Sequence, residues 1–181
     1  ILYHMHFRLF LNFLLAFFLL SACTPSSEHE VACRATKVSD SPMLPAASAA
    51  GCLIHFSEHT LLVEHRLTGR LDIPGGGQQA GETLACTAHR ETFEETGFNV
   101  LVGAPVAQTT NGMVIFACTL DNVVDVAHFP RPVPDFADVE IRQLNLVNLF
   151  DIDPPALRFA QDMIPFRDAM TRTPSSTPLF D

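Results

Sequence analysis

Residues 74–98 read PGGGQQAGETLACTAHRETFEETGF, and this stretch decides the fold. Three glycines at 75–77 precede a segment, 83–96, whose residue spacing predicts a helix that stops at Gly97. At about 100° per residue, one arginine and three glutamates fall on the same side of that helix. These four residues are Arg90, Glu91, Glu94 and Glu95. Like charges this close on a helix repel one another, and only the arginine offsets the repulsion.

A divalent cation is a suitable further partner for this acidic side, because Mg²⁺ prefers clustered oxygen ligands. Glu82 lies just before the helix, where it is placed to pair with Arg90 and fix the acidic side. The glycines permit a tight backbone that a ligand can approach closely. Each feature alone has a simpler interpretation, a solvated helix face for the glutamates and a flexible turn for the glycines. Their combination indicates a functional site.

The spacing of these residues follows one pattern, Gly-x5-Glu-x7-Arg-Glu-U-x-Glu-Glu-x-Gly-U, in which U is bulky and usually aliphatic. The residues in register are Gly76, Glu82, Arg90, Glu91, Thr92, Glu94, Glu95, Gly97 and Phe98. The chain thereby resembles the Nudix hydrolases over residues 49–165. Thr92 departs from the pattern, since an aliphatic residue is usual there, and Leu71 stands where an aromatic residue often lies. Neither departure removes a carboxylate.

The resemblance implies an α/β fold, a Nudix-type α/β/α sandwich with a mixed β-sheet, and an enzyme that hydrolyses a diphosphate linkage. The substrate is commonly a nucleoside diphosphate joined to some group X, or a related small molecule. By position, Glu91, Glu94 and Glu95 are implied to coordinate Mg²⁺ or Mn²⁺. Arg90 and Glu82 are implied to orient them. A divalent cation between carboxylates and a diphosphate neutralises the substrate and activates the attacking water.

The general base is open, because in this family it is either a glutamate of the motif or a residue of a later loop. Glu140 opens a predicted strand ahead of the last helix and is the main candidate for an additional ligand or base. Asp138 is the rival, and both carboxylates also fit a plain solvated loop.

Candidate substrate contacts lie around the glycine cluster. The candidates are Gly75, Gly76, Gly77 and Arg66. The glycines are expected to shape the approach of the substrate, and Arg66, with His65 beside it, is a candidate for a phosphate contact. The same two residues equally fit a surface hairpin. His89 falls on the side of the helix away from the glutamates and is expected to be structural.

Outside the motif, apolar segments bounded by turn residues predict strands. The expected strands are Ala50–Phe56, Thr60–Glu64, Leu71–Pro74, Phe98–Gly103, Gly112–Leu120 and Glu140–Val147. A last helix is expected from Pro154, capped by Asp153 and ended or kinked at Pro165. Strands alternating with two helices predict one α/β domain, residues 49–170, followed by a disordered tail, residues 171–181.

The charge of the chain excludes some classes of partner. Its formal net charge is −9 at pH 7, and Lys37 is its only lysine. An acidic surface repels nucleic-acid backbones and anionic lipid headgroups, so no nucleic-acid polymer is expected as a partner. A small phosphate-bearing substrate is therefore expected to be held by bridging cations or by a few local arginines. Oligomeric state is not encoded in these features.

The N-terminal sequence predicts export. An apolar run at 9–20 follows a basic residue, and Leu20-Ser21-Ala22-Cys23 then resembles a bacterial lipobox. Residues 1–22 are therefore expected to be a signal peptide, Cys23 the lipidated residue, and residues 23–48 a flexible tether. The expected location is the periplasmic face of a bacterial membrane, contacted only through this lipid anchor, or the periplasm. An ordinary cleaved signal and a short anchor helix are the alternatives.

The remaining cysteines bear on the same question. They are Cys33, Cys52, Cys86 and Cys118. No Cys-x-x-Cys spacing occurs among them, so a zinc site is not expected. In an oxidising compartment at least one disulfide is expected, with the pairing open, while four reduced and half-buried thiols are the alternative.

Three functions are compatible with the sequence. A metal-dependent diphosphate hydrolase, exported to the cell envelope, uses the complete set of glutamates. A non-catalytic Nudix-fold lipoprotein that binds or senses a nucleotide is the alternative, and a purely structural envelope lipoprotein leaves the motif without a role. The motif does not encode the substrate, whose recognition is expected in the loops at 104–112 and 121–138.

Overall fold

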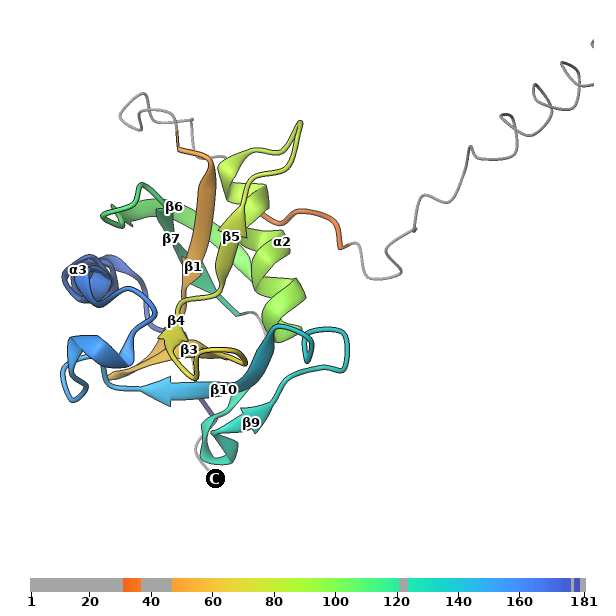
Figure 1. Ribbon diagram of the computed structural model, residues 1–181. Helices are drawn as coiled ribbons and strands as arrows, with labels where there is room; N and C mark the ends of the chain where they lie inside the picture. Colours follow the sequence, from red (N-terminus) through yellow and green to blue (C-terminus); the bar gives the residue numbers. More distant parts are fainter. Residues whose placement is uncertain (1–30, 37–46, 121–123, 177, 180–181) are drawn as a thin grey trace, which may run out of the picture. The chain divides into compact units, whose positions relative to one another are not determined.

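The computed structural model describes residues 31–36, 47–120, 124–176 and 178–179 (Figure 1). The chain divides into two units, residues 1–30 and residues 31–181, and the following concerns the second unit. The expected signal peptide, the lipidated Cys23 and most of the expected tether lie outside the described residues.

The first sheet has four strands in the order β5-β1-β7-β6. They are β1 (Ala49–Leu53), β5 (Gly75–Gly77), β6 (Leu101–Gln108) and β7 (Val114–Thr119). β1 and β7 run parallel, whereas β5 pairs with β1, and β6 with β7, in the antiparallel direction. The sheet is therefore mixed, which confirms the expected sheet type.

A second, five-stranded sheet is built on β3 (His59–His65). Its other strands are β2 (His55–Phe56), β4 (Leu71–Asp72), β9 (Arg131–Pro132) and β10 (Ile141–Val147). β2, β4 and β10 pair with β3, and β9 pairs with β10, all antiparallel. The single strand expected over residues 50–56 is therefore wrong, because this run forms β1 and β2 in different sheets. Every residue from 50 to 56 is buried, so the apolar pattern does not mark the switch.

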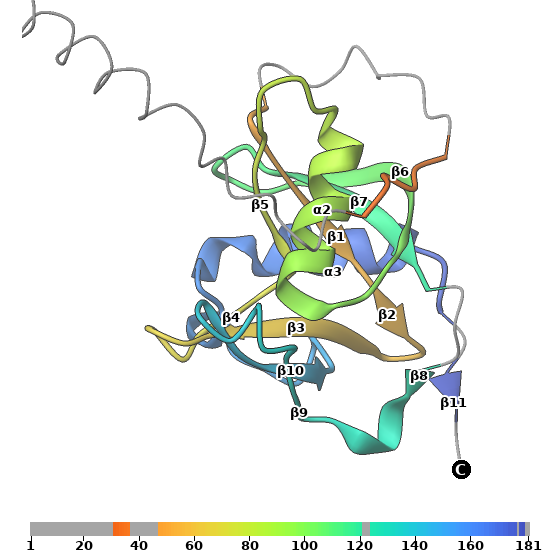
Figure 2. The ribbon, with the colours of Figure 1, turned by 90° about the vertical axis from the view of Figure 1, so that its right-hand side faces the viewer.

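Among the described residues, two α-helices cover opposite faces of the first sheet (Figure 1; Figure 2). They are α2 (Leu84–Thr96) and α3 (Met163–Arg172). Along β1, Cys52 belongs to the apolar core that contains Ala88 of α2, whereas Leu53 belongs to the core that contains Phe166 of α3. This alternation is that of a strand buried on both faces, and it produces the expected α/β/α sandwich. Within the described part of the chain, neither helix has the length and apolar character that spanning a membrane requires.

Helix α2 is capped at both ends, at its C-terminus by the expected Gly97. Thr83 has an extended backbone, and its hydroxyl accepts a hydrogen bond from the Cys86 N–H. Gly97 is left-handed with a φ of 75°, and its N–H donates to Phe93 O. The helix expected over residues 83–96 is therefore confirmed, and its caps fix where the acidic side begins and ends.

Two elements near α2 differ from the sequence prediction. Gly75–Gly77 is not a loop but the edge strand β5, because it pairs with Ala49–Gly51 of β1. β6 starts at Leu101 instead of Phe98, because the Phe98 N–H still bonds to the Thr96 hydroxyl at the end of α2. The first difference arises from pairing with a distant segment, whereas the second arises from a local hydrogen bond that extends the end of α2.

The last helix also starts later than expected. Pro154 opens only a short 3₁₀ helix, η2 (Pro154–Ala156), and η3 (Ala160–Asp162) follows before α3 begins. Asp153 makes no side-chain capping bond there. Pro165 lies in the first turn of α3, where a backbone N–H has no partner within the helix, so it neither ends nor kinks the helix.

Residues at both ends of the expected domain are attached to it. Ser176 N donates to His55 O at 2.8 Å, and β11 (Pro178–Leu179) pairs with β8 (Val124–Asp125), where a disordered tail was expected. In the expected tether, Thr36 N donates to Val102 O at 2.8 Å. The domain therefore includes segment 31–36 and residues beyond 170.

Two disulfides confirm the expectation of at least one. Cys33 is joined to Cys86 in the first turn of α2, and Cys52 of β1 is joined to Cys118 of β7. The second bridge is fully buried in the core, whereas the first fastens segment 31–36 to the helix that carries the glutamates.

Removing the Cys33–Cys86 bridge is expected to lower the free energy of unfolding by about 2–4 kcal/mol, because cross-links over long loops restrict the unfolded chain. The bridge spans 53 residues of sequence. Urea unfolding of the Cys33→Ser/Cys86→Ser double variant measures the loss. The single variant Cys33→Ser is the control, since it should lose the same amount if the cross-link itself is responsible. A double variant as stable as the wild type contradicts the prediction.

Candidate active site

The site forms where strand β5 passes beside helix α2. The Gly75 N–H donates to Glu95 Oε2 at 2.9 Å, so the edge strand and the helix meet at a candidate catalytic carboxylate. Gly76 faces Glu91, and a Cβ placed on Gly76 would lie 2.6 Å from the Glu91 carboxyl carbon. Glycine is required here because a side chain would occupy the space of that carboxylate. The glycines therefore make room for the glutamates.

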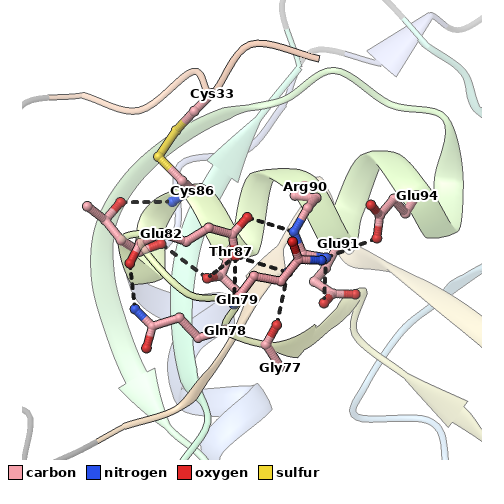
Figure 3. A network of polar contacts seen from close by, with 11 residues as sticks. Cys33, Gly77, Gln78, Gln79, Glu82, Cys86, Thr87, Arg90, Glu91 and Glu94 are labelled. Carbon is pink, nitrogen blue, oxygen red and sulfur yellow. Dashed lines mark hydrogen bonds and ion pairs between the residues drawn. A yellow bond between two sulfur atoms is a disulfide. The ribbon is translucent and has the colours of Figure 1, made fainter. Parts of the chain in front are cut away.

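Arg90 organises the carboxylates (Figure 3). Its Nε and Nη2 donate to the two carboxylate oxygens of Glu82 at 2.7 and 3.1 Å, which is a bidentate pair. Its Nη1 donates to Glu91 Oε1 at 2.9 Å and to Glu94 Oε2 at 3.0 Å. Nη2 also donates to Gly77 O at 2.9 Å. Arg90 thereby ties the start of the helix, strand β5 and two of the candidate metal ligands together.

Glu82 is fixed from several directions. Besides the pair with Arg90, its Oε2 accepts hydrogen bonds from Gln79 N and from the Thr87 hydroxyl, both at 3.0 Å. The hydrogen bond from Arg90 is the main reason why the pKa of Glu82 falls to about 2. Glu82 is therefore ionised near neutral pH, and its contacts support the orienting role that the resemblance implies.

The three glutamates of the acidic side differ in burial. Glu95 is 7% exposed, and burial raises its pKa well above the ordinary value. Burial also raises the pKa of Glu91, although the attraction of Arg90 opposes the rise. The charge of Glu140 adds to the rise in both cases. The Glu94 side chain is 49% exposed and lies at the solvent side of the group.

The chemistry of these carboxylates suits a divalent cation. Glu91 and Glu95 repel each other where water is largely excluded, and a hard cation with oxygen ligands would relieve that repulsion. Within the described residues, no three His, Cys, Asp or Glu side chains are gathered as a ready metal site. Figure 3 shows the carboxylates of Glu91 and Glu94 turned toward Arg90, whose Nη1 donates to both. The ligand set of Glu91, Glu94 and Glu95 therefore stays a prediction.

The two candidates for the general base are placed differently. Glu140 directly precedes β10 with a side chain that is 67% exposed, and its charge acts on Glu91 and Glu95. Asp138 instead forms an ion pair with Arg66, whose Nε also donates to Asp138 O at 2.6 Å. The structure thus places Glu140 near the helix glutamates, whereas Asp138 and Arg66 pair with each other.

Asp72 and Arg158, which the sequence pattern does not single out, lie beside this centre. Asp72 ends β4 and is 7% exposed, and its Oδ1 accepts a hydrogen bond from Ile73 N at 2.9 Å. Burial raises the pKa of Asp72 to about 7 in spite of the positive charge of Arg158. The Arg158 N–H donates to Leu71 O at 2.7 Å, which joins the segment after η2 to β4. Only tertiary structure brings these residues together.

Replacing Asp72 by asparagine is expected to stabilise the protein at pH 8 and not at pH 4. A pKa raised from 3.8 to about 7 means that folding favours the protonated acid, so the free energy of unfolding falls as the pH rises between these values. Each pKa unit is worth about 1.4 kcal/mol, which sets the expected gain of Asp72→Asn at pH 8 on the order of 2–4 kcal/mol. Urea unfolding at the two pH values, without divalent metal, measures it.

The control is Asp151→Asn, which removes an equal charge at an exposed position. This control should leave the pH dependence of stability unchanged. An Asp72→Asn variant with the wild-type slope between pH 4 and pH 8 would contradict the prediction, because the share of the slope that Asp72 contributes beside Glu91 and Glu95 should be lost.

Two histidines have structural contacts. His89 is 1% exposed, and its Nε2 bonds to Asn99 Oδ1 at 2.9 Å. The ring nitrogens of His55 contact Ser57 O at 3.1 Å and Thr173 O at 2.6 Å. The structural role expected for His89 is therefore confirmed.

The threonine that departs from the motif does not disturb α2. Thr92 is fully buried, and its hydroxyl donates to Ala88 O at 2.7 Å. A buried hydroxyl that bonds to the carbonyl one turn earlier is satisfied within the helix. The presence of threonine instead of the usual aliphatic residue thus leaves no unpaired polar group at this position.

Comparison with known proteins gives one family match and many structural ones. The sequence model described as the NUDIX domain matches residues 45–167 of the chain. No curated protein sequence matches the chain. The matched range includes β5, α2 and all of the carboxylates described above.

Solved structures share the fold at low sequence identity. An ADP-ribose pyrophosphatase from Streptococcus suis 89-1591 is 19% identical over 74% of this chain and 97% of its own, with a TM-score of 0.54. A UDP-X diphosphatase is 17% identical over 75% of this chain and 68% of its own, with a TM-score of 0.55. A C. elegans Ap4A hydrolase is 18% identical over 68% of this chain and 96% of its own, with a TM-score of 0.53. At these identities the similarity establishes the fold alone.

Proposed function

The chain belongs to the Nudix family, and we propose that it is a metal-dependent hydrolase that cleaves a diphosphate linkage in a nucleoside diphosphate-X or related small molecule. The observation that carries this proposal is the network around Arg90. One guanidinium holds Glu82, Glu91 and Glu94 together, while Glu95 is held by the backbone of the neighbouring strand. A surface helix with only a solvated acidic face has no need of such an arrangement.

The acidic set supplies the ligands and their supports. When bound to Glu91, Glu94 and Glu95, Mg²⁺ or Mn²⁺ supplies charge neutralisation for the diphosphate and activation of the attacking water. Arg90 sets the direction of the Glu91 and Glu94 carboxylates, and ionised Glu82 keeps the guanidinium in place. The buried position of Glu95 removes one carboxylate from bulk water, which strengthens its electrostatic interactions.

The reaction consumes one water. Its oxygen bonds to one phosphorus, the bond from that phosphorus to the bridging oxygen breaks, and the bridging oxygen leaves on the other phosphate. We assign the proton of the water to Glu140, because its carboxylate is exposed, lies outside the Arg90 network and acts electrostatically on Glu91 and Glu95. Each of the two products ends in a phosphate group.

The names of the structural neighbours suggest where a substrate search should begin. Those proteins are named for ADP-ribose, UDP-X and Ap4A, and each such compound contains phosphates joined through a shared oxygen. A panel of these three classes, assayed with Mg²⁺, with Mn²⁺ and with a chelator, tests the proposed function. Turnover that requires the metal supports it.

The alternative is a protein of the same fold that binds a nucleotide without cleaving it. Titration calorimetry on the same panel separates the two functions. Tight binding of a compound that stays intact after prolonged incubation with metal would favour the binding protein. The retention of every glutamate of the motif favours the hydrolase.

We further propose that the protein is exported and anchored through lipidated Cys23. The lipobox-like sequence and the two disulfides support this location, because disulfides persist mainly in oxidising compartments. Fractionation of cells that express the full chain tests it. Cys23→Ser should move the protein from the membrane fraction to the soluble fraction, whereas an unchanged distribution would contradict the anchor.

A further inference from the structure

Arg158 is held beside the acidic centre by contacts that leave most of its donors unused. Its Nη1 lies 3.3 Å from His65 Nε2, and its guanidinium carbon lies 5.4 Å from the centre of the Phe159 ring. Its backbone N–H is bonded to Leu71 O. The side chain therefore has a defined position against β3 and β4 while it remains exposed to solvent.

The pairing of Arg158 differs from that of several other arginines. Ion pairs with carboxylates are formed, for example, by Arg66, Arg90, Arg142 and Arg172. In the portion of the chain that the structure describes, Arg158 forms no ion pair with a carboxylate, and its charge acts on Asp72 only from beyond contact distance. A guanidinium has five donors in a planar fork that matches phosphate oxygens, and one contact to an imidazole uses few of them.

Neighbouring charged residues connect Arg158 to the candidate active site. The charge of Arg158 acts on Asp72, and the charge of Asp72 acts on Glu95. In the other direction, His65 lies between Arg158 and Glu140, with its Nδ1 4.0 Å from Glu140 Oε1. Arg158 is thus a positive group at the border of a group of carboxylates.

His65 fixes the orientation of the Arg158 guanidinium. An arginine can only donate, so His65 Nε2 must accept, and the imidazole is neutral with its proton on Nδ1. That proton faces Glu140. His65 is 7% exposed, and its ring is fixed by burial in β3. A neutral, fixed acceptor orients Arg158 without neutralising its charge, which a carboxylate in the same place would do.

We propose that Arg158 binds phosphate oxygens of the substrate at the edge of the acidic site, and that His65 is the residue that positions its guanidinium. This inference rests on the proposed diphosphate hydrolysis and assigns it a substrate-binding residue outside the Nudix motif. Arg158 supplies direct donors to an anion that the surrounding carboxylates repel. Binding, rather than the chemical step, is its contribution.

The test compares Arg158→Gln with Arg172→Gln, which removes an equal charge from the far end of α3. Arg158→Gln should raise KM for the diphosphate by about 30-fold and leave kcat within about threefold, since a charge-assisted bidentate contact to phosphate is lost from binding. Arg172→Gln should change neither constant. Arg158→Lys should fall between, because an ammonium keeps the charge without the fork.

The positioning role of His65 has its own readout. His65→Leu should raise KM in the wild-type background and have no further effect in Arg158→Gln, because the two residues act as a unit. His65→Gln keeps an acceptor and should restore much of the binding. Urea midpoints close to that of the wild type check that each variant is folded.

Calorimetric titration with methylenediphosphonate and Mg²⁺ separates this inference from the proposed function. If the wild type turns over a diphosphate and Arg158→Gln has the same KM, the role of Arg158 is overturned and the hydrolase stands. If the wild type turns over nothing, the hydrolase is overturned, and weaker binding by Arg158→Gln alone still supports the anion contact. Equal affinities of the two proteins for the probe, or no binding by the wild type, overturn the anion contact.

Discussion

Replacing Glu95 by glutamine is expected to lower kcat by about 10³-fold, in the range of losses seen when an essential charged catalytic group is removed. The same variant should be at least as stable as the wild type without metal. Glu95 is 7% exposed and lies near the negative charges of Glu91, Glu140 and Asp72. Glutamine removes the carboxylate of Glu95 from this group, and its Oε1 can still accept the hydrogen bond from Gly75 N.

The combination of the two effects identifies the role of Glu95. Changing a residue that is kept for folding lowers the stability of the protein, whereas a catalytic carboxylate crowded among other carboxylates in a buried site is retained at a cost in stability. Initial rates with Mg²⁺ and urea unfolding in chelator are the two measurements. Glu58→Gln, at the exposed turn between β2 and β3, is the control for the change in net charge. A Glu95→Gln variant with wild-type kcat would remove Glu95 from the mechanism.

Gly76→Ala is expected to lower kcat by about 10²-fold, because misplacing a catalytic group by about an ångström has effects of this size. The new methyl group would lie 2.6–2.7 Å from the three carboxylate atoms of Glu91. These atoms are the far end of a flexible side chain, so Glu91 moves and the fold is kept. The shift separates Glu91 from its place beside Arg90 and Glu95.

The neighbouring glycines make this prediction specific. A Cβ on Gly77 meets nothing within 4 Å, so Gly77→Ala should keep wild-type kinetics and stability. A Cβ on Gly75 would lie 2.6 Å from the Gly51 Cα and 2.8 Å from Ala50 O, so Gly75→Ala should lower stability by separating β5 from β1. Steady-state rates and urea midpoints of the three variants distinguish these outcomes. Equal effects at Gly76 and Gly77 would contradict the role assigned to Gly76.

Local sequence signals predicted the helix that carries the glutamates and the pairing that supports them. Thr83 and Gly97 mark the ends of α2, and the helical repeat correctly placed Arg90 beside two glutamates. The pairing of Glu82 with Arg90 was also expected, because Glu82 lies within reach just before the helix. These contacts join residues close in sequence, so the pattern of residue types is sufficient to find them.

Contacts between distant segments were not predictable in the same way. The glycines form a strand because β1 lies alongside them, and the run at 50–56 divides because its two halves join different sheets. Arg158 lies beside β4, where its backbone N–H bonds to Leu71, a residue in another part of the chain. The helical repeat also placed Glu95 with Arg90, whereas Glu95 bonds to Gly75 instead.

Phosphorus NMR of the purified protein with a diphosphate substrate and Mg²⁺ tests the central claim most directly. The wild type should convert the resonances of the linked phosphates into those of two separate phosphate groups. Glu95→Gln, prepared and assayed in parallel, should leave the substrate spectrum unchanged over the same time. If the wild type leaves every member of the panel intact, or if Glu95→Gln converts it equally fast, the acidic side of α2 is not a diphosphate-cleaving centre.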